Sequence, residues 1–116
     1  MFHFNQGSLA RLEEAERHFA IAIGLDQEFG AAYGMYARSM SRRAYSFLPA
    51  DAEALYEKAK IAAQRAVMLN PSDASAHVAK GFALELHDLN AAIASLQEAL
   101  SLNPDSSLAH FALGRM

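Results

Sequence analysis

Apolar residues recur every three or four positions in three stretches of the chain. This spacing places them on one face of a helix, so each stretch predicts an amphipathic helix with one buried side. No stretch alternates apolar and polar residues with a period of two, and the sequence therefore predicts an all-α fold without a sheet. The three apolar sets are Leu12, Ala15, Phe19, Ala22 and Ile23; Leu55, Ala59, Ala63, Ala66 and Val67; and Leu89, Ala92, Ile93, Leu96, Ala99 and Leu100.

Two Asn-Pro pairs predict where the second and third of these helices end. Proline cannot continue a helix and restricts the residue before it, so we expect stops at Asn70-Pro71 and Asn103-Pro104. Short polar residues follow each stop and can accept a hydrogen bond from the first turn of the next helix. The candidate N-caps are Ser72 or Asp73, and Asp105 or Ser106.

The chain also repeats itself. Residues 64–71 and 76–81 match residues 97–104 and 109–114 at a constant offset of 33, with identical Ala, Leu, Asn, Pro, His and Gly residues. A fainter copy lies 44 residues upstream of the middle one, on positions such as Ala15, Ala22 and Leu25. A fixed period of this size is typical of helical repeat proteins.

The two offsets differ by 11 residues, which predicts an insertion in the middle unit. Its expected site is near 46–51, where Pro49 separates two helical patterns. We expect about six helices in a single domain, residues 1–116. The predicted units are 1–27, a partial repeat ending in its second helix; 28–72, a repeat with the insertion; 73–105, a full repeat; and 106–116, the first helix of a further repeat.

These repeated positions resemble the tetratricopeptide repeat family over nearly the whole chain. The family places an aromatic and then a small residue in the first helix of each unit, and two alanines in the second. The first-helix positions are Tyr33 and Ala37, His77 and Gly81, and His110 and Gly114; the second-helix positions are Ala15 and Ala22, Ala59 and Ala66, and Ala92 and Ala99. The resemblance implies a right-handed superhelical stack of antiparallel helical hairpins, an α-solenoid, whose concave groove binds a peptide or helix of a partner protein.

The chain departs from the family pattern in three respects, the first being that its complete unit is one residue short. Histidine replaces the usual aromatic residue twice, and the first unit closes with Asp26-Gln27 where the family has a proline. The histidines are expected to fill the aromatic position between the helices of a hairpin. The irregular insertion is similar to the C-terminal repeat region of bacterial regulatory proteins such as adenylate cyclases and winged-helix transcription regulators.

Repeat arrays usually close with a polar capping helix, and this chain shows none. We therefore interpret it as a fragment of a longer protein, with Phe2 and Phe4 as remains of an earlier first helix. Phe111 and Leu113 are expected to pack back on the preceding helices or to join a second copy. A homodimer through the uncapped edges is one possible assembly.

Composition narrows the function further. Hydrophobic residues make up 53% and charged residues 20%, which favours a folded core over disorder. The net charge of -3 argues against nucleic acid, whose phosphates need clustered Lys and Arg. No apolar run is long enough to span a membrane, and no basic leader precedes one, so we expect a cytoplasmic protein. No catalytic motif, metal-ligand set or cofactor loop appears, so we expect no enzyme, metal or cofactor.

Candidate binding residues lie on the predicted first helices. Arg38 and Arg42 are four residues apart on one helical face, where they could bind an acidic peptide or simply form a solvated helix end. Apolar positions with charged neighbours continue along the later helices. The remaining candidates for the concave groove are Val78, Phe82, Glu85, Phe111 and Arg115. Two alternatives stay open: an oligomerisation or spacer segment, and a domain that senses a small effector.

Overall fold

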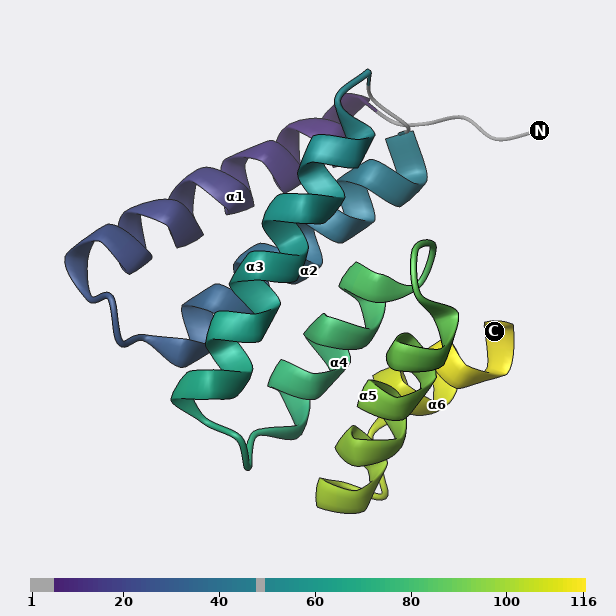
Figure 1. Cartoon of the computed structure of the whole chain (residues 1–116). Helices are drawn as coiled ribbons and strands as arrows, with labels where there is room; N and C mark the ends of the chain where they lie inside the picture. The colour runs from purple at the N-terminus through teal and green to yellow at the C-terminus, as the bar shows by residue number, and fades with distance from the viewer. Residues whose placement is uncertain (1–5, 48–49) are drawn as a thin grey trace.

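The computed structural model describes residues 6–47 and 50–116 and contains only helices in these ranges. The predicted all-α class is therefore confirmed. Short connections reverse the chain between successive helices, as Figure 1 shows. The helices are α1 (Gln6–Leu25), α2 (Gly30–Phe47), α3 (Ala52–Leu69), α4 (Ala74–Leu84), α5 (Leu89–Leu102) and α6 (Ser107–Arg115).

The predicted helix ends are confirmed. Helices α3 and α5 stop directly before the two Asn-Pro pairs. The structure also decides between the cap candidates, because the Asp73 carboxylate accepts a hydrogen bond from the Ser75 N–H (2.9 Å). In the same way, Ser106 Oγ accepts from the Ala109 N–H (3.2 Å). Each cap satisfies one of the backbone donors that the first turn of a helix leaves without an intrahelical partner.

The longer middle unit owes its length to longer helices. Helix α2 has 18 residues, seven more than the 11 of α4, and α3 has 18, four more than the 14 of α5. Seven and four residues are about two turns and one turn, so both extensions keep the apolar face in register. Within the predicted insertion near 46–51, Leu48 and Pro49 lie outside the described residues.

Each helix packs against the next one in the chain. Helix α4 also contacts both α2 and α6, whereas α1, α3 and α5 make no comparable contacts with one another among the described residues. Helices α2, α4 and α6 therefore form a continuous row, with the other helices packed along it (Figure 1).

Small side chains dominate the two buried clusters. Alanine lets helix axes approach toward the short end of the usual 8–10 Å spacing, and Met40, Leu96 and Val78 are the largest side chains that are fully buried. The first cluster joins α2, α3 and α4, and the second joins α4, α5 and α6. Their buried members are Ala37, Met40, Ala44, Leu55, Tyr56, Ala59, Ala62, Ala63, Ala79 and Ala83 in the first, and Val78, Leu96, Ala99, Ala109 and Ala112 in the second.

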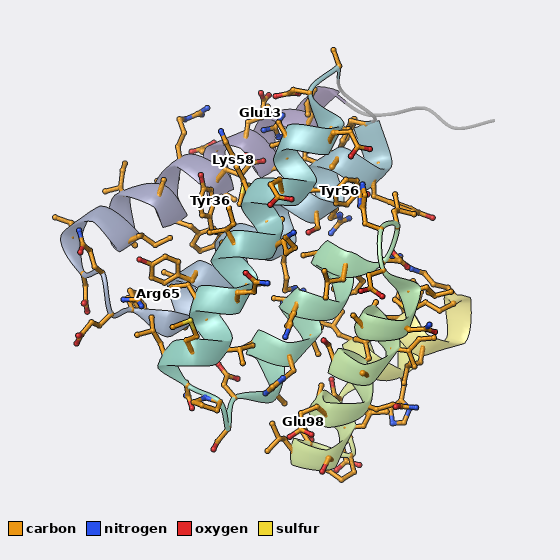
Figure 2. The ribbon with its side chains drawn as sticks, viewed as in Figure 1. Glu13, Tyr36, Tyr56, Lys58, Arg65 and Glu98 are labelled. Atoms are coloured by element: carbon orange, nitrogen blue, oxygen red, sulfur yellow. The ribbon has the colours of Figure 1, made fainter. Side chains whose placement is uncertain are left out.

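A charged contact joins α1 to α2. The Arg43 guanidinium donates two hydrogen bonds to the Glu16 carboxylate, at 2.6 Å from Nε and 2.9 Å from Nη2. Both side chains are mostly buried, with exposed fractions of 16% and 13%. Glu13 of α1 and Tyr36 of α2 line the same small hollow (Figure 2). This bidentate pair fixes the register of α1 on α2.

Candidate functional site

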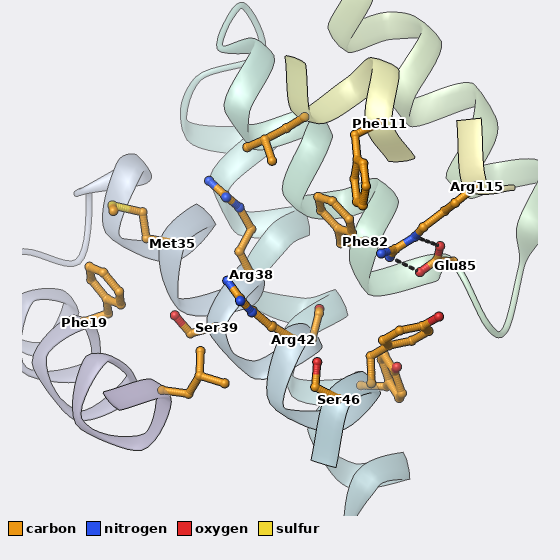
Figure 3. Close-up of a pocket in the computed structure, with 15 residues that line it drawn as sticks. Phe19, Met35, Arg38, Ser39, Arg42, Ser46, Phe82, Glu85, Phe111 and Arg115 are labelled. Carbon is orange, nitrogen blue, oxygen red and sulfur yellow. Dashed lines mark hydrogen bonds and ion pairs between the residues drawn. The ribbon is translucent and has the colours of Figure 1, made fainter. Parts of the chain in front are cut away.

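A groove of about 540 Å³ opens between α1 and α2 on one side and α4 and α6 on the other. Figure 3 shows that its walls combine aromatic rings, aliphatic side chains and guanidinium groups. Helix α5 contributes none of its lining residues and α3 only one. The lining residues are Leu12, Phe19, Met35, Arg38, Ser39, Ser41, Arg42, Tyr45, Ser46, Tyr56, Phe82, Glu85, Leu108, Phe111 and Arg115.

The structure brings six of the seven sequence-predicted residues to this groove. Arg38, Arg42, Phe82, Glu85, Phe111 and Arg115 all line it. Val78 does not, because its side chain is 2% exposed and packs in the cluster with Leu96 and Ala109. Leu113 packs back on the same cluster, while Phe111 is 62% exposed at the groove.

Sequence reasoning missed several lining residues. Met35 and Tyr45 precede and follow Arg38 by three and seven positions, so the helical period alone places them on the same face. Leu12 and Phe19 are likewise seven apart on α1. By contrast, no sequence signal points to Tyr56, which reaches the groove from α3 and depends on how the hairpins pack.

Arg115 lies at one end of the groove, where a carboxylate balances its charge and three aromatic rings surround it. Its guanidinium donates two hydrogen bonds to the Glu85 carboxylate, at 2.8 Å from Nε and 2.6 Å from Nη2 (Figure 3). The same group lies 4.9 Å from the ring centre of Tyr45, 5.2 Å from Phe82 and 5.5 Å from Phe111. These distances are typical of cation–π contacts. The hydrogen bonds that Arg115 donates to Glu85 raise the pKa of the guanidinium, so Arg115 stays charged and Glu85 balances its charge.

Tyr56 lies next to this cluster and is almost fully buried. Burial first, and then the negative charge of Glu85, raise the pKa of its phenol to about 12. Both effects disfavour the phenolate, because an anion in this position loses water and gains a like-charged neighbour. Tyr56 is therefore neutral at every physiological pH.

Arg38 and Arg42 lie in the middle of the groove, on α2, and their charges are not compensated. Neither makes an ion pair or hydrogen bond with another described residue, although they line the same wall of α2 (Figure 3). Burial lowers the pKa of Arg38, and repulsion from Arg42 lowers it further. The groove thus has a cationic section at α2 and a neutral section at Arg115.

The chemistry that this lining offers is that of binding. Ser39, Ser41 and Ser46 supply hydroxyl groups, but the described lining residues include no histidine that could serve as a base for them. Its one carboxylate, Glu85, is held in the pair with Arg115. No three His, Cys, Asp or Glu side chains converge as a metal site anywhere in the described parts of the chain.

The repeat-related histidines have a local structural role. The Nε2–H of His77 donates to the Pro71 carbonyl (2.8 Å), and that of His110 donates to the Pro104 carbonyl at the same distance. His110 is exposed, so the expectation that it fills a position between two helices is wrong. A hydrogen bond to the preceding turn is the better account, since the imidazole finds a polar partner within six residues.

The described helices are all too short or too polar to cross a membrane. The sequence matches no protein-family model and no curated protein at a significant level. The resemblance to tetratricopeptide repeats therefore rests on the repeated residues themselves.

Proposed function

We propose that this chain is a protein-interaction module of the tetratricopeptide type, and that its groove binds a peptide or helical segment of a partner protein. One observation carries the proposal. Side chains from five helices converge on a groove of about 540 Å³ that combines exposed apolar surface with two uncompensated cations. Such a mixture suits a segment with both apolar and polar side chains.

The arrangement of the helices supports the repeat interpretation. Helices α2 and α4 begin 44 residues apart, at Gly30 and Ala74, and α6 begins 33 residues later, at Ser107. These repeat-related helices pack in a row and supply most of the groove. In a superhelical stack, the equivalent helices of successive units line one continuous inner face.

The exposed groove residues support a macromolecular partner. Met35 is 48% exposed and Phe111 62%, and both lie on the groove wall. Large apolar side chains that remain exposed beside charged groups are typical of surfaces that bind another protein. The same lining offers recognition groups and no catalytic pair, which favours a binding role over an enzymatic one.

Peptide display against the intact chain tests this proposal. Selected peptides should bind in solution and should lose affinity for a Phe111→Ser variant. The matched control is Ile61→Ser, because Ile61 is 58% exposed on α3 and lies outside the groove. Molar mass by light scattering should be recorded for each variant. Peptides that bind both variants equally, or self-association that excludes peptides, would contradict a groove-binding module and favour an oligomerisation role.

A further inference from the structure

The arginines of α2 and α6 differ sharply in their partners. Arg43 is paired with Glu16, and Arg115 with Glu85, each through two hydrogen bonds. Arg38 and Arg42 line the groove without any carboxylate partner among the described residues. The fold therefore neutralises two of these cations and leaves an adjacent pair open to a ligand.

The open pair is unfavourable in the free protein. Arg38 is half-buried, and both burial and the neighbouring charge of Arg42 lower its pKa. Both effects oppose the charged form, because burial removes water and a like charge repels. A bound anion would relieve both at once, and guanidinium groups suit carboxylates because they can form two parallel hydrogen bonds with each.

A second feature of the groove also lacks a partner. Ser41 lines the groove and is 4% exposed, and its hydroxyl makes no hydrogen bond with any described residue. Buried hydroxyl groups in native structures normally have a partner. Ser41 lies one position before Arg42. A ligand oxygen that reaches the groove floor beside the arginines could therefore accept a hydrogen bond from the Ser41 hydroxyl.

The apolar surroundings define the rest of the ligand. The lining residues of α2 run from Met35 to Ser46, about 16 Å along the helix axis. Along α2, Met35 precedes the arginine pair and Tyr45 follows it, and both line the groove. Phe111 of α6 lies across the groove from the pair (Figure 3). A strip of this length, cationic in its middle and apolar at both ends, fits several consecutive side chains better than a single phosphate group.

We propose that the partner segment is an acidic, amphipathic peptide, with one or two Glu or Asp carboxylates bound by Arg38 and Arg42 and apolar side chains on both sides. This inference rests on the function proposed above and specifies its ligand. The three arginines and one glutamate of the groove leave an excess of two positive charges, which two carboxylates would neutralise.

Three synthetic peptides test the inference on the intact chain by fluorescence anisotropy. All three peptides carry pairs of leucines at the same positions. The residues between the leucine pairs are glutamate in the first peptide, glutamine in the second and phosphoserine in the third. We expect the glutamate peptide to bind most tightly, and the Arg38→Gln, Arg42→Gln double variant to lose affinity by about tenfold or more, because hydrogen bonds to charged groups are the strong ones. An Arg11→Gln variant is the matched control, since Arg11 is exposed on α1 and lies outside the groove.

A charge exchange sharpens the test. The Arg38→Glu, Arg42→Glu double variant should prefer a lysine version of the peptide over the glutamate version. Equal binding of the glutamate and glutamine peptides, a preference for phosphoserine, or no binding of the glutamate peptide would each overturn the inference. Groove-dependent binders from display that lack acidic residues would overturn it while leaving the proposed function intact.

A measurement without ligand provides a second readout. Replacing both arginines by glutamine should raise the melting temperature of the free chain, because it removes two uncompensated like charges. A lower melting temperature would show that the pair stabilises the fold and is not held open for a ligand.

Discussion

Gly81 of α4 lies against Leu96 of α5 so closely that a side chain has no room between them. A Cβ atom at Gly81 would lie 2.7 Å from Leu96 Cγ and 2.8 Å from its Cδ2. Leu96 is fully buried and cannot move without disturbing the cluster around it. Alanine would gain about 1 kcal/mol in helix propensity, but overpacking of a core typically costs 1–3 kcal/mol. We expect Gly81→Ala to destabilise the chain by up to about 2 kcal/mol in urea unfolding.

The repeat supplies its own control. Gly114 occupies the equivalent position one unit later, where a Cβ atom would meet nothing within 4 Å. Gly114→Ala should therefore be neutral or slightly stabilising. If both substitutions changed stability equally, helix propensity would explain them and the contact with Leu96 would not.

The Arg43–Glu16 pair should hold α1 on α2. Breaking a mostly buried, bidentate pair leaves one charge without its partner, so we expect Glu16→Gln to cost about 1–3 kcal/mol. Hydrogen exchange should show the loss of protection in α1 first, because α2 is the only described helix against which α1 packs.

The contrasting variant is Glu57→Gln. Glu57 pairs with Lys60 on the surface of α3, with 62% of its side chain exposed. Exposed pairs contribute about 0–1 kcal/mol, so this change should be almost silent. Uniform loss of protection across all helices in Glu16→Gln would contradict a local role for the buried pair.

The sequence predicts those features that depend on local rules. The stops at Leu69 and Leu102 follow from Asn-Pro chemistry. The sequence narrows each cap to two neighbouring residues, and the structure selects Asp73 and Ser106. The all-α class follows from the apolar period. Each of these is decided within a few residues of chain, where propensity and packing agree.

The features that the sequence does not predict depend on contacts between residues far apart in the chain. Val78 and Phe82 are four apart on α4, yet one is buried against α5 and α6 and the other lines the groove. The helical period of about 3.6 residues cannot tell which positions of α4 are buried and which line the groove, because this depends on where α6 packs. The Arg115–Glu85 pair spans 30 residues and carries no sequence signal. It nevertheless makes the section of the groove around Arg115 neutral, next to the cationic section at Arg38 and Arg42.

Replacing Ser41 by alanine should stabilise the free chain, whereas truncating most buried side chains destabilises it. Its hydroxyl is buried without a partner in the described part of the chain. Removing an unsatisfied polar group relieves a desolvation penalty of about 1–3 kcal/mol. We expect Ser41→Ala to stabilise the free chain by about 1 kcal/mol in urea unfolding, and to weaken binding of the glutamate peptide. A loss of stability would indicate a hydrogen bond that the structure does not contain.

The residues that precede α4 and α3 should contribute unequally to the stability of the fold. Asp73 accepts a hydrogen bond from Ser75, whereas Asp51 precedes α3 without a side-chain cap bond. Loss of a cap typically costs about 1 kcal/mol, so Asp73→Ala should lower stability by about that amount and Asp51→Ala by less. Thermal unfolding followed by circular dichroism measures both. A larger effect at Asp51 would contradict the assigned caps.

Tyr56 should make stability depend on alkaline pH. The pKa of its phenol is about 12 in the folded chain and 10.0 for an ordinary tyrosine, so the folded state favours the neutral form. That contribution is complete below pH 10 and is lost as the pH rises toward 12. A shift of two units corresponds to about 2–3 kcal/mol. Urea unfolding at pH 9 and near pH 12 should show this loss in the native chain and in a Tyr33→Phe control, but not in Tyr56→Phe. An equal loss in Tyr56→Phe would assign the alkaline transition to other groups.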